Sequence, residues 1–140
     1  MYGEELYKRL AKEYRYAATK MQESPTASKK LYYFSIFYGE PQRIINLEWD
    51  RDLTLLFVVC QYVFNTLTAL SNPPALNTHP INHDLVFTAL TDLANELALH
   101  FEKKESNPIE LYVIMGRLAE IGYAATGNGS YLYEKGDIKF

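Results

Sequence analysis

The sequence predicts an all-α protein, with a basic N-terminal helical arm followed by a compact bundle of three to four helices. Apolar residues recur every three or four positions along several long stretches, which is the spacing of one helix face. Prolines and glycines that interrupt helices lie between these stretches. The 140 residues are enough to bury one working core. We assign residues 1–40 to the arm and residues 41–140 to the bundle.

The first predicted helix covers residues 3–23 and has two chemically distinct faces. One face collects the apolar residues Leu6, Leu10, Tyr14, Ala17 and Met21. The opposite arc collects Lys8, Arg9, Lys12, Arg15 and Lys20, together with Tyr16. Pro25 ends the helix, because it cannot continue the hydrogen-bond ladder and pushes Ser24 out of the helical region.

The next segment, "ASKKLYYFSIFYG" at residues 27–39, is compatible with a strand or with a short helix. Its aromatic content permits a strand, whereas Ser28 as a cap and Gly39 as a terminator permit a helix. We favour a helix, because no neighbouring segment offers a strand partner. Pro41 suits the first position of a further helix, which we expect to run from residue 41 to about residue 70.

No formally charged residue occurs from Leu53 to His83, and residues 53–70 are apolar enough to raise the question of a membrane span. Gln61, Asn65 and three threonines interrupt this run, so a buried core helix is favoured. We therefore expect residues 53–70 to be helical and mostly buried, in the core or in a subunit interface. The residues expected there include Leu55, Leu56, Val59 and Val63.

The second half of the chain continues with a loop and two helices. Three prolines and three asparagines mark residues 71–82 as a loop. Residues 83–105 predict an amphipathic helix whose inner face holds Leu85, Leu90, Leu93, Leu97 and Phe101. Asn107 is expected to cap a last helix that starts at Pro108 and ends near residue 127. The tail can close as a small β-hairpin around Gly136.

The sequence shows no pattern typical of a catalytic or metal site. His79 and His83 are four residues apart, but Pro80 and the loop composition argue against a helical ligand pair. Cys60, the single cysteine, lies in the apolar run without a basic neighbour that would lower its pKa, so we expect it to be buried. We predict that the protein is not an enzyme and carries no metal and no cofactor.

Positive charge is concentrated near the N-terminus. Residues 8–43 hold eight Lys or Arg against three Glu, a balance of +5, so the rest of a chain of net charge −3 carries −8. Lys and Arg neutralise phosphates, and tyrosines stack on bases or hydrogen-bond phosphate. The candidate nucleic-acid-binding residues are Lys8, Arg9, Lys12, Arg15, Tyr16, Lys20, Lys29, Lys30 and Arg43. The same pattern also fits a solvated surface with tyrosines in the core.

The layout resembles that of the major coat proteins of filamentous archaeal viruses. The resemblance lies in the basic helix "ELYKRLAKEYRYAATK", the Ser/Pro break after it, and the ending "SNPIELYVIMGRLAEIGYAATGNGSYLY". It implies a virion subunit that wraps linear double-stranded DNA without sequence specificity, as a homo- or hetero-oligomer with a related coat subunit. It also implies contact with a lipid envelope in some members. The positions that match the family's DNA-facing helix are Lys8, Arg9, Lys12, Arg15, Lys20, Lys29 and Lys30.

Two other function classes fit the same size and charge. One is the small helical subunit of an RNA-guided multisubunit complex, and the other is a helical enzyme or interaction protein. Both would place the chain in the cytoplasm rather than in a virion. A coat protein forms filaments, a guide-complex subunit co-purifies with RNA and larger proteins, and an enzyme has a polar pocket with perturbed titratable groups.

Overall fold

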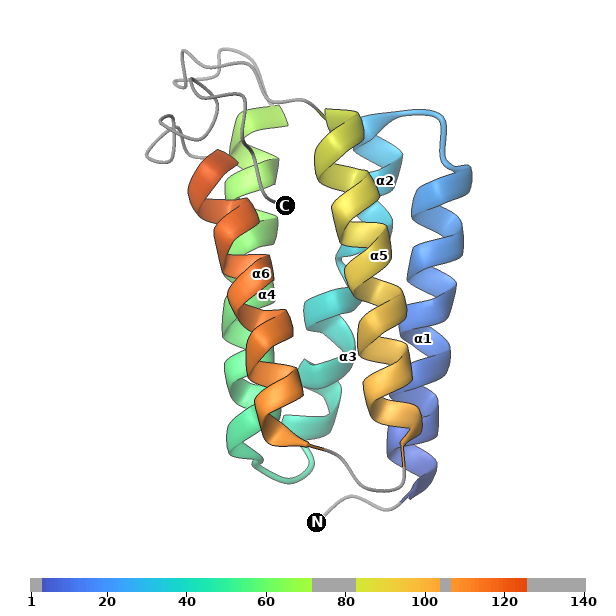
Figure 1. The fold of residues 1–140 in the computed structure, drawn as a ribbon, viewed down its shortest axis with the longest axis vertical. Coiled ribbons are helices and arrows are strands. Elements are labelled where there is room, and N and C mark those ends of the chain that lie inside the picture. The colour runs from blue at the N-terminus through green and yellow to red at the C-terminus, as the bar shows by residue number, and fades with distance from the viewer. Residues whose placement is uncertain (1–3, 72–82, 104–106, 126–140) are drawn as a thin grey trace.

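The computed structural model describes residues 4–71, 83–103 and 107–125, and every regular element in them is a helix (Figure 1). The helices are α1 (Glu4–Glu23), α2 (Ala27–Phe34), α3 (Ile36–Ile45), α4 (Arg51–Ser71), α5 (His83–Glu102) and α6 (Pro108–Ala125). The all-α prediction is therefore confirmed. Most of the predicted loop at residues 71–82 and the predicted hairpin around Gly136 lie outside the described residues.

The helices stand side by side in one elongated bundle (Figure 1). Helices α2 and α3 follow one another and are separated only by Ser35, whose backbone is itself helical. Helix α1 contacts α2, α3 and α5, whereas α4 contacts α2, α3 and α6, and α5 also contacts α6. Helix α1 and the pair α4 and α6 consequently form opposite sides of the bundle.

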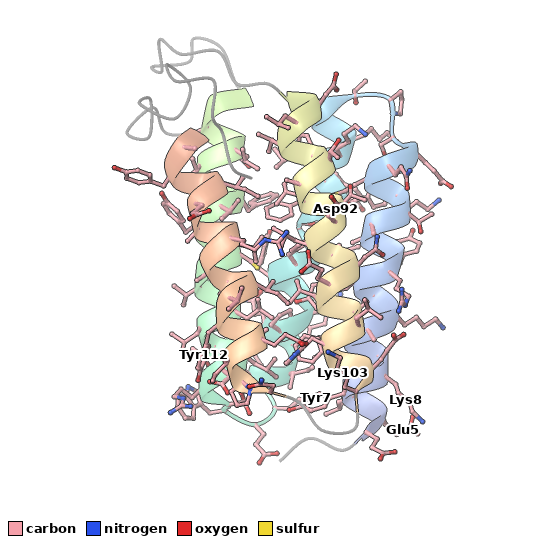
Figure 2. The ribbon with its side chains drawn as sticks, in the orientation of Figure 1. Glu5, Tyr7, Lys8, Asp92, Lys103 and Tyr112 are labelled. Atoms are coloured by element: carbon pink, nitrogen blue, oxygen red, sulfur yellow. The ribbon has the colours of Figure 1, made fainter. Side chains whose placement is uncertain are left out.

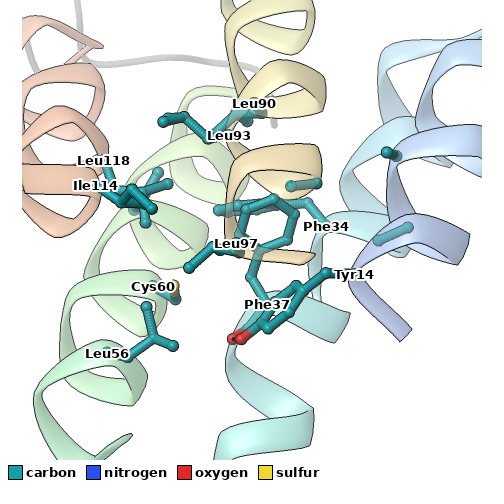
Figure 3. Close-up of a cluster of buried hydrophobic side chains, with 14 of the residues drawn as sticks. Tyr14, Phe34, Phe37, Leu56, Cys60, Leu90, Leu93, Leu97, Ile114 and Leu118 are labelled. Carbon is teal, nitrogen blue, oxygen red and sulfur yellow. Dashed lines mark hydrogen bonds between the residues drawn. The ribbon is translucent and has the colours of Figure 1, made fainter. Parts of the chain in front are cut away.

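Helix α1 confirms the predicted helix at residues 3–23, but its description as an arm is not confirmed. Leu10, Tyr14, Ala17 and Met21 are buried, as their spacing predicted. They belong to the same hydrophobic cluster as residues of α3, α4, α5 and α6 (Figure 3). The core thus draws on residues before and after position 41, and α1 packs as a full member of the bundle.

The segment at residues 27–39 is helical, so the open choice between strand and helix is resolved. Thr26, rather than Ser28, is the N-cap: its side chain accepts a hydrogen bond from the Lys29 N–H at 3.2 Å. Gly39 lies inside α3 and does not end a helix.

The predicted continuous helix from residue 41 to about residue 70 is wrong, because the chain turns between α3 and α4. Helix α3 ends at Ile45, and α4 starts again at Arg51. The Asp50 carboxylate accepts a hydrogen bond from the Leu53 N–H at 2.9 Å, which satisfies a donor that would be unpaired at the start of α4. An aspartate with this role marks a helix start, and the sequence reading had placed it inside a helix.

Pro41 lies inside α3 instead of starting a helix, and α1 compensates for it. A proline has no N–H, so the carbonyl four residues earlier, that of Phe37, loses its helical donor. The buried Tyr14 hydroxyl donates to this Phe37 oxygen at 2.9 Å. The Tyr14 ring also packs edge-on against the Phe37 ring, with centroids 5.5 Å apart. The proline therefore fixes where α1 docks.

Helix α4 confirms the predicted helix, but its burial is one-sided. Leu56, Cys60 and Val63 are fully buried, as expected, and Val59 is half-buried. The expectation that residues 53–70 are mostly buried is wrong. Leu55 is 44% exposed and does not belong to the core of the chain, so for this residue only the subunit-interface alternative stays a prediction. The helix is long and apolar enough to cross a membrane over Arg51–Ala69, where the mean hydropathy is 1.3, but a core helix meets the same criterion. Only 28% of this window is buried.

Helices α5 and α6 follow the prediction with two corrections. Leu90, Leu93, Leu97 and Phe101 are buried, but Leu85 is exposed. Helix α5 ends at Glu102, three residues before the predicted end. The predicted cap at Asn107 is confirmed, because its side chain accepts a hydrogen bond from the Ile109 N–H at 3.0 Å. The buried His100 lies 3.0 Å from Glu110, which also pairs with Lys103 and so ties α5 to α6.

The link between Tyr14 and Pro41 predicts a double-mutant coupling. Tyr14→Phe should reduce the free energy of unfolding by about 1–3 kcal/mol, because the buried Phe37 carbonyl loses its donor. The same change should cost much less in the Pro41→Ala background, since the new backbone N–H can serve that carbonyl. Urea unfolding of the four proteins measures the coupling. Equal costs of Tyr14→Phe in both backgrounds would contradict the compensation.

The two adjacent leucines of α4 offer a matched test of its one-sided burial. Leu56→Ala should cost about 2–5 kcal/mol of unfolding free energy, because it removes a fully buried side chain. Leu55→Ala should cost less than about 1 kcal/mol in dilute protein, since much of that side chain is already in water. Chemical unfolding at low protein concentration compares them. Similar losses for the two variants would place Leu55 in the core after all.

Candidate nucleic-acid interface

The basic residues predicted on the first helix do lie on its outward face. Lys8, Arg9, Lys12, Arg15 and Tyr16 are exposed and Lys20 is half-buried, on the side of α1 that faces away from the core. Lys8 and Glu5 project outward from the lower part of α1 (Figure 2). An exposed cation that already forms an ion pair within the chain is less available to a ligand. The partners of each basic side chain are therefore described in turn.

Arg9 and Arg43 are engaged by a buried carboxylate. Glu40 is only 7% exposed, and its oxygens lie 3.5 Å from Arg9 and 3.1 Å from Arg43. A buried carboxylate is tolerated only when it is paired, so these two arginines serve the fold by joining α1 to α3. They are poor candidates for phosphate contacts, because a phosphate would have to compete with Glu40.

Arg15, Lys20 and Lys30 also have partners inside the chain. The Arg15 guanidinium donates two hydrogen bonds, of 3.0 and 2.5 Å, to the two Glu102 oxygens on α5. This pairing holds the pKa of the Glu102 carboxyl below its ordinary value. Lys20 lies 3.8 Å from Glu23, and Lys30 donates to the Met21 carbonyl. Five of the nine candidates therefore have structural partners: Arg9, Arg15, Lys20, Lys30 and Arg43.

Lys8, Lys12 and Lys29 form the remainder of the cationic set. Their ammonium groups are exposed, and none of them has an ion pair within the described residues. Lys8 and Lys12 are four residues apart and share one stripe of α1, whereas Lys29 lies in the first turn of α2. Glu13, half-buried on α1, offsets part of this charge. The available cations are thus fewer than the sequence suggested.

Three tyrosines form an aromatic cluster beside these lysines. Tyr16 lies edge-on to Tyr33 at 6.1 Å, and Tyr33 lies edge-on to Tyr32 at 5.1 Å. Tyr16 and Tyr32 are well exposed, and the Lys20 ammonium lies 5.7 Å from the Tyr16 ring centre. We call Lys8, Lys12, Lys29, Tyr16, Tyr32 and Tyr33 the cationic face. The combination of ammonium groups with exposed rings suits a polyanion that carries bases.

The sequence reading missed the groups that neutralise its candidates. Glu40 stands three residues before Arg43, which is a readable helical ion-pair spacing. The pairing of Arg15 with Glu102 spans 87 positions and has no local signal. Tyr38, which the sequence does not separate from the surface tyrosines, packs against the Phe64 ring of α4 with centroids 5.0 Å apart.

The opposite side of the bundle exposes a largely apolar surface. We call it the α4–α6 face, and it comprises Leu55, Val58 and Tyr62 of α4 with Tyr112, Val113 and Tyr123 of α6. Val58 is 54% exposed and Val113 is 56% exposed. Tyr112 and Lys8 lie on opposite flanks of the bundle (Figure 2). The cationic face and the α4–α6 face therefore do not overlap.

Two hollows lie among the described residues. A groove of about 330 Å³ is lined by polar groups of α1, α2 and α5, including Gln22, Lys30, Asp84 and Asp92. A smaller cavity of about 50 Å³ lies beside His100 and Asp50. Burial raises the pKa of the Cys60 thiol, which disfavours a reactive thiolate. No group of three or more His, Cys, Asp or Glu that could hold a metal occurs in the described ranges.

Comparison with known proteins adds no further constraint. No protein-family model, no curated protein and no solved structure matches the chain. Any function must therefore be argued from the two faces themselves.

The division of the cations into paired and available groups predicts different stability effects. Arg9→Gln combined with Arg43→Gln should cost about 1–3 kcal/mol, because Glu40 is left buried without its cations. Adding Glu40→Gln should recover part of this loss. Lys8→Gln combined with Lys12→Gln, the matched control, should change stability by less than about 0.5 kcal/mol. Thermal and urea unfolding compare the variants, and equal effects of the two pairs would contradict the assignment.

Proposed function

We propose that the protein is a structural subunit that coats nucleic acid in a repeating assembly, as the coat proteins that it resembles coat double-stranded DNA in a virion. The observation that carries the proposal is the presence of two separate exposed faces on one rigid bundle. The cationic face suits a polyanion, and the α4–α6 face suits a neighbouring protein surface. A repeating coat needs both kinds of contact.

The small number of available cations favours backbone coating over tight binding by one subunit. Lys8, Lys12 and Lys29 offer about three phosphate contacts, and Glu13 offsets part of them. Such a site binds weakly and without base readout, since phosphate contacts carry no sequence information. Repetition along one polymer multiplies a weak affinity, because each added subunit binds at high effective concentration. The proposed role therefore depends on assembly.

The cationic face predicts a specific change in salt dependence. Lys8→Gln combined with Lys12→Gln should weaken binding to duplex DNA and reduce the slope of log affinity against log salt by about 2, because two phosphate contacts are lost. The control is Gln42→Glu combined with Asn46→Asp, which lowers the net charge equally at exposed positions of α3 and its C-cap. Fluorescence titration at several salt concentrations measures both pairs.

Two outcomes would overturn the proposal. An unchanged affinity and salt slope in the lysine variant would remove the cationic face as the binding site. A clear preference for single-stranded RNA over duplex DNA would favour the RNA-guided complex instead. Electron microscopy of the wild type with and without duplex DNA completes the test, and DNA-dependent filaments are the expected result.

A further inference from the structure

We propose that the α4–α6 face binds the same face of a second copy of this chain, in an antiparallel two-fold arrangement. This inference rests on the assembly half of the proposed function and names the partner.

Helices α4 and α6 run side by side in the same direction, in a defined register. The Tyr112 hydroxyl bonds to Asp52 at 2.7 Å and accepts from Arg51 at 3.0 Å, which places residue 112 beside the first turn of α4. At the other end, a Cβ built on Gly122 would lie 2.6 Å from the Tyr62 ring. Each residue of α6 therefore lies level with the α4 residue whose number is smaller by 60.

This register places Gly116 at the middle of the face, where no contact within the chain requires a glycine among the described residues. Gly116 is exposed and lies level with Leu56, between the apolar residues near both ends of the face. A Cβ at Gly116 would meet nothing within 4 Å, so nothing among the described residues requires a glycine there. Glycine in the middle of a helix is unfavourable relative to alanine. A glycine at this position would allow a helix of a second copy to approach the α6 backbone closely.

The charges at the edge of the face are complementary under an antiparallel two-fold axis. Arg51 lies at one end of the face, where it pairs with Asp52 of its own chain at 3.3 Å, and the exposed Glu120, level with Cys60, lies beyond the middle of the face. Glu120 has no ion pair within the described residues. A two-fold axis perpendicular to the helices and level with residues 55–56 sets α4 against α4 and α6 against α6 of the second copy. Because the Arg51 side chain reaches across to Tyr112 of α6, it comes to the height of the second copy's Glu120 on the adjacent helix. The contact forms twice, as an isologous interface requires.

The size of the face is adequate for such a dimer. A helix of 21 residues beside one of 18 residues gives a surface roughly 30 Å long and about 20 Å wide. Its projected area is roughly 600 Å², and the accessible area of a ridged helix surface is larger. This is comparable with the roughly 800 Å² that each partner buries in a specific interface. A lipid surface fits less well, because Glu120 would have to be buried in it unpaired.

Sedimentation of the purified full chain without nucleic acid tests the inference. The wild type should dimerise, and Val58→Asp should weaken dimerisation at least tenfold while helicity is retained, because Val58 is not part of the monomer core. Thr19→Asp, an exposed change on α1, is the control and should leave the dimer intact. A monomeric wild type, or a Val58→Asp variant that dimerises normally, would overturn the inference.

Two further variants test the geometry. Gly116→Ala should raise the melting temperature of dilute protein but weaken dimerisation, whereas Gly39→Ala, also in open space, should leave dimerisation unchanged. Arg51→Glu and Glu120→Arg should each weaken the dimer, and the double variant should recover it. A double variant that stays weak would exclude the antiparallel arrangement.

Three outcomes separate this inference from lipid binding and from the nucleic-acid half of the proposed function. Flotation of the protein with phosphatidylcholine vesicles, lost in Val58→Asp, would assign the face to lipid and overturn the second-copy proposal. Dimerisation without any binding of DNA would support this inference while the nucleic-acid half of the proposed function fails. Binding of DNA by a protein that never dimerises would overturn this inference while the nucleic-acid half of the proposed function is supported.

Discussion

The hydrogen bond from Tyr14 to the Phe37 carbonyl is the contact on which the rest of the architecture depends. Pro41 removes the helical donor of that carbonyl, and a buried carbonyl without a donor is strongly unfavourable. The Tyr14 side chain from α1 supplies a replacement donor, and this hydrogen bond holds α1 against α3 at this point. The Tyr14 ring also stacks on Phe101 of α5, with centroids 6.0 Å apart. One residue thereby joins three helices.

The docking of α1 determines which of its cations remain available. Arg9 lies at the edge of α1 next to α3 and reaches Glu40, whereas Arg15 lies at the edge next to α5 and reaches Glu102. Lys8 and Lys12 lie between these edges and point away from both neighbours. The pairing is therefore a geometric consequence of helix packing. A helix that projected from the bundle as an arm would have kept Arg9 and Arg15 available, whereas the pairing of Lys20 with Glu23 lies within α1 and does not depend on docking.

The sequence predicted those features that have a local signal. The recurrence of Leu10, Tyr14, Ala17 and Met21 defines one face, so the burial of α1 could be read directly. Helix α4 carries apolar residues on most of its sides, so periodicity could not separate the buried Leu56 from the exposed Leu55. The break before α4 had a readable signal in Asp50, but the reading of Pro41 as a helix start concealed it. Pairing over long sequence distances, as between Arg15 and Glu102, leaves no local pattern.

The separation of the two faces has a consequence for assembly. If a polyanion and a neighbouring subunit used the same surface, each would exclude the other, and repetition could not raise the affinity. Because α1 and the pair α4 and α6 lie on opposite sides of the bundle, association of two copies leaves both cationic faces open. A two-fold dimer then presents two cationic faces on its outer sides. The proposed dimer would therefore hold two separate stretches of a polyanion, one on each side, and its gain in affinity would depend on both stretches being within reach at the same time.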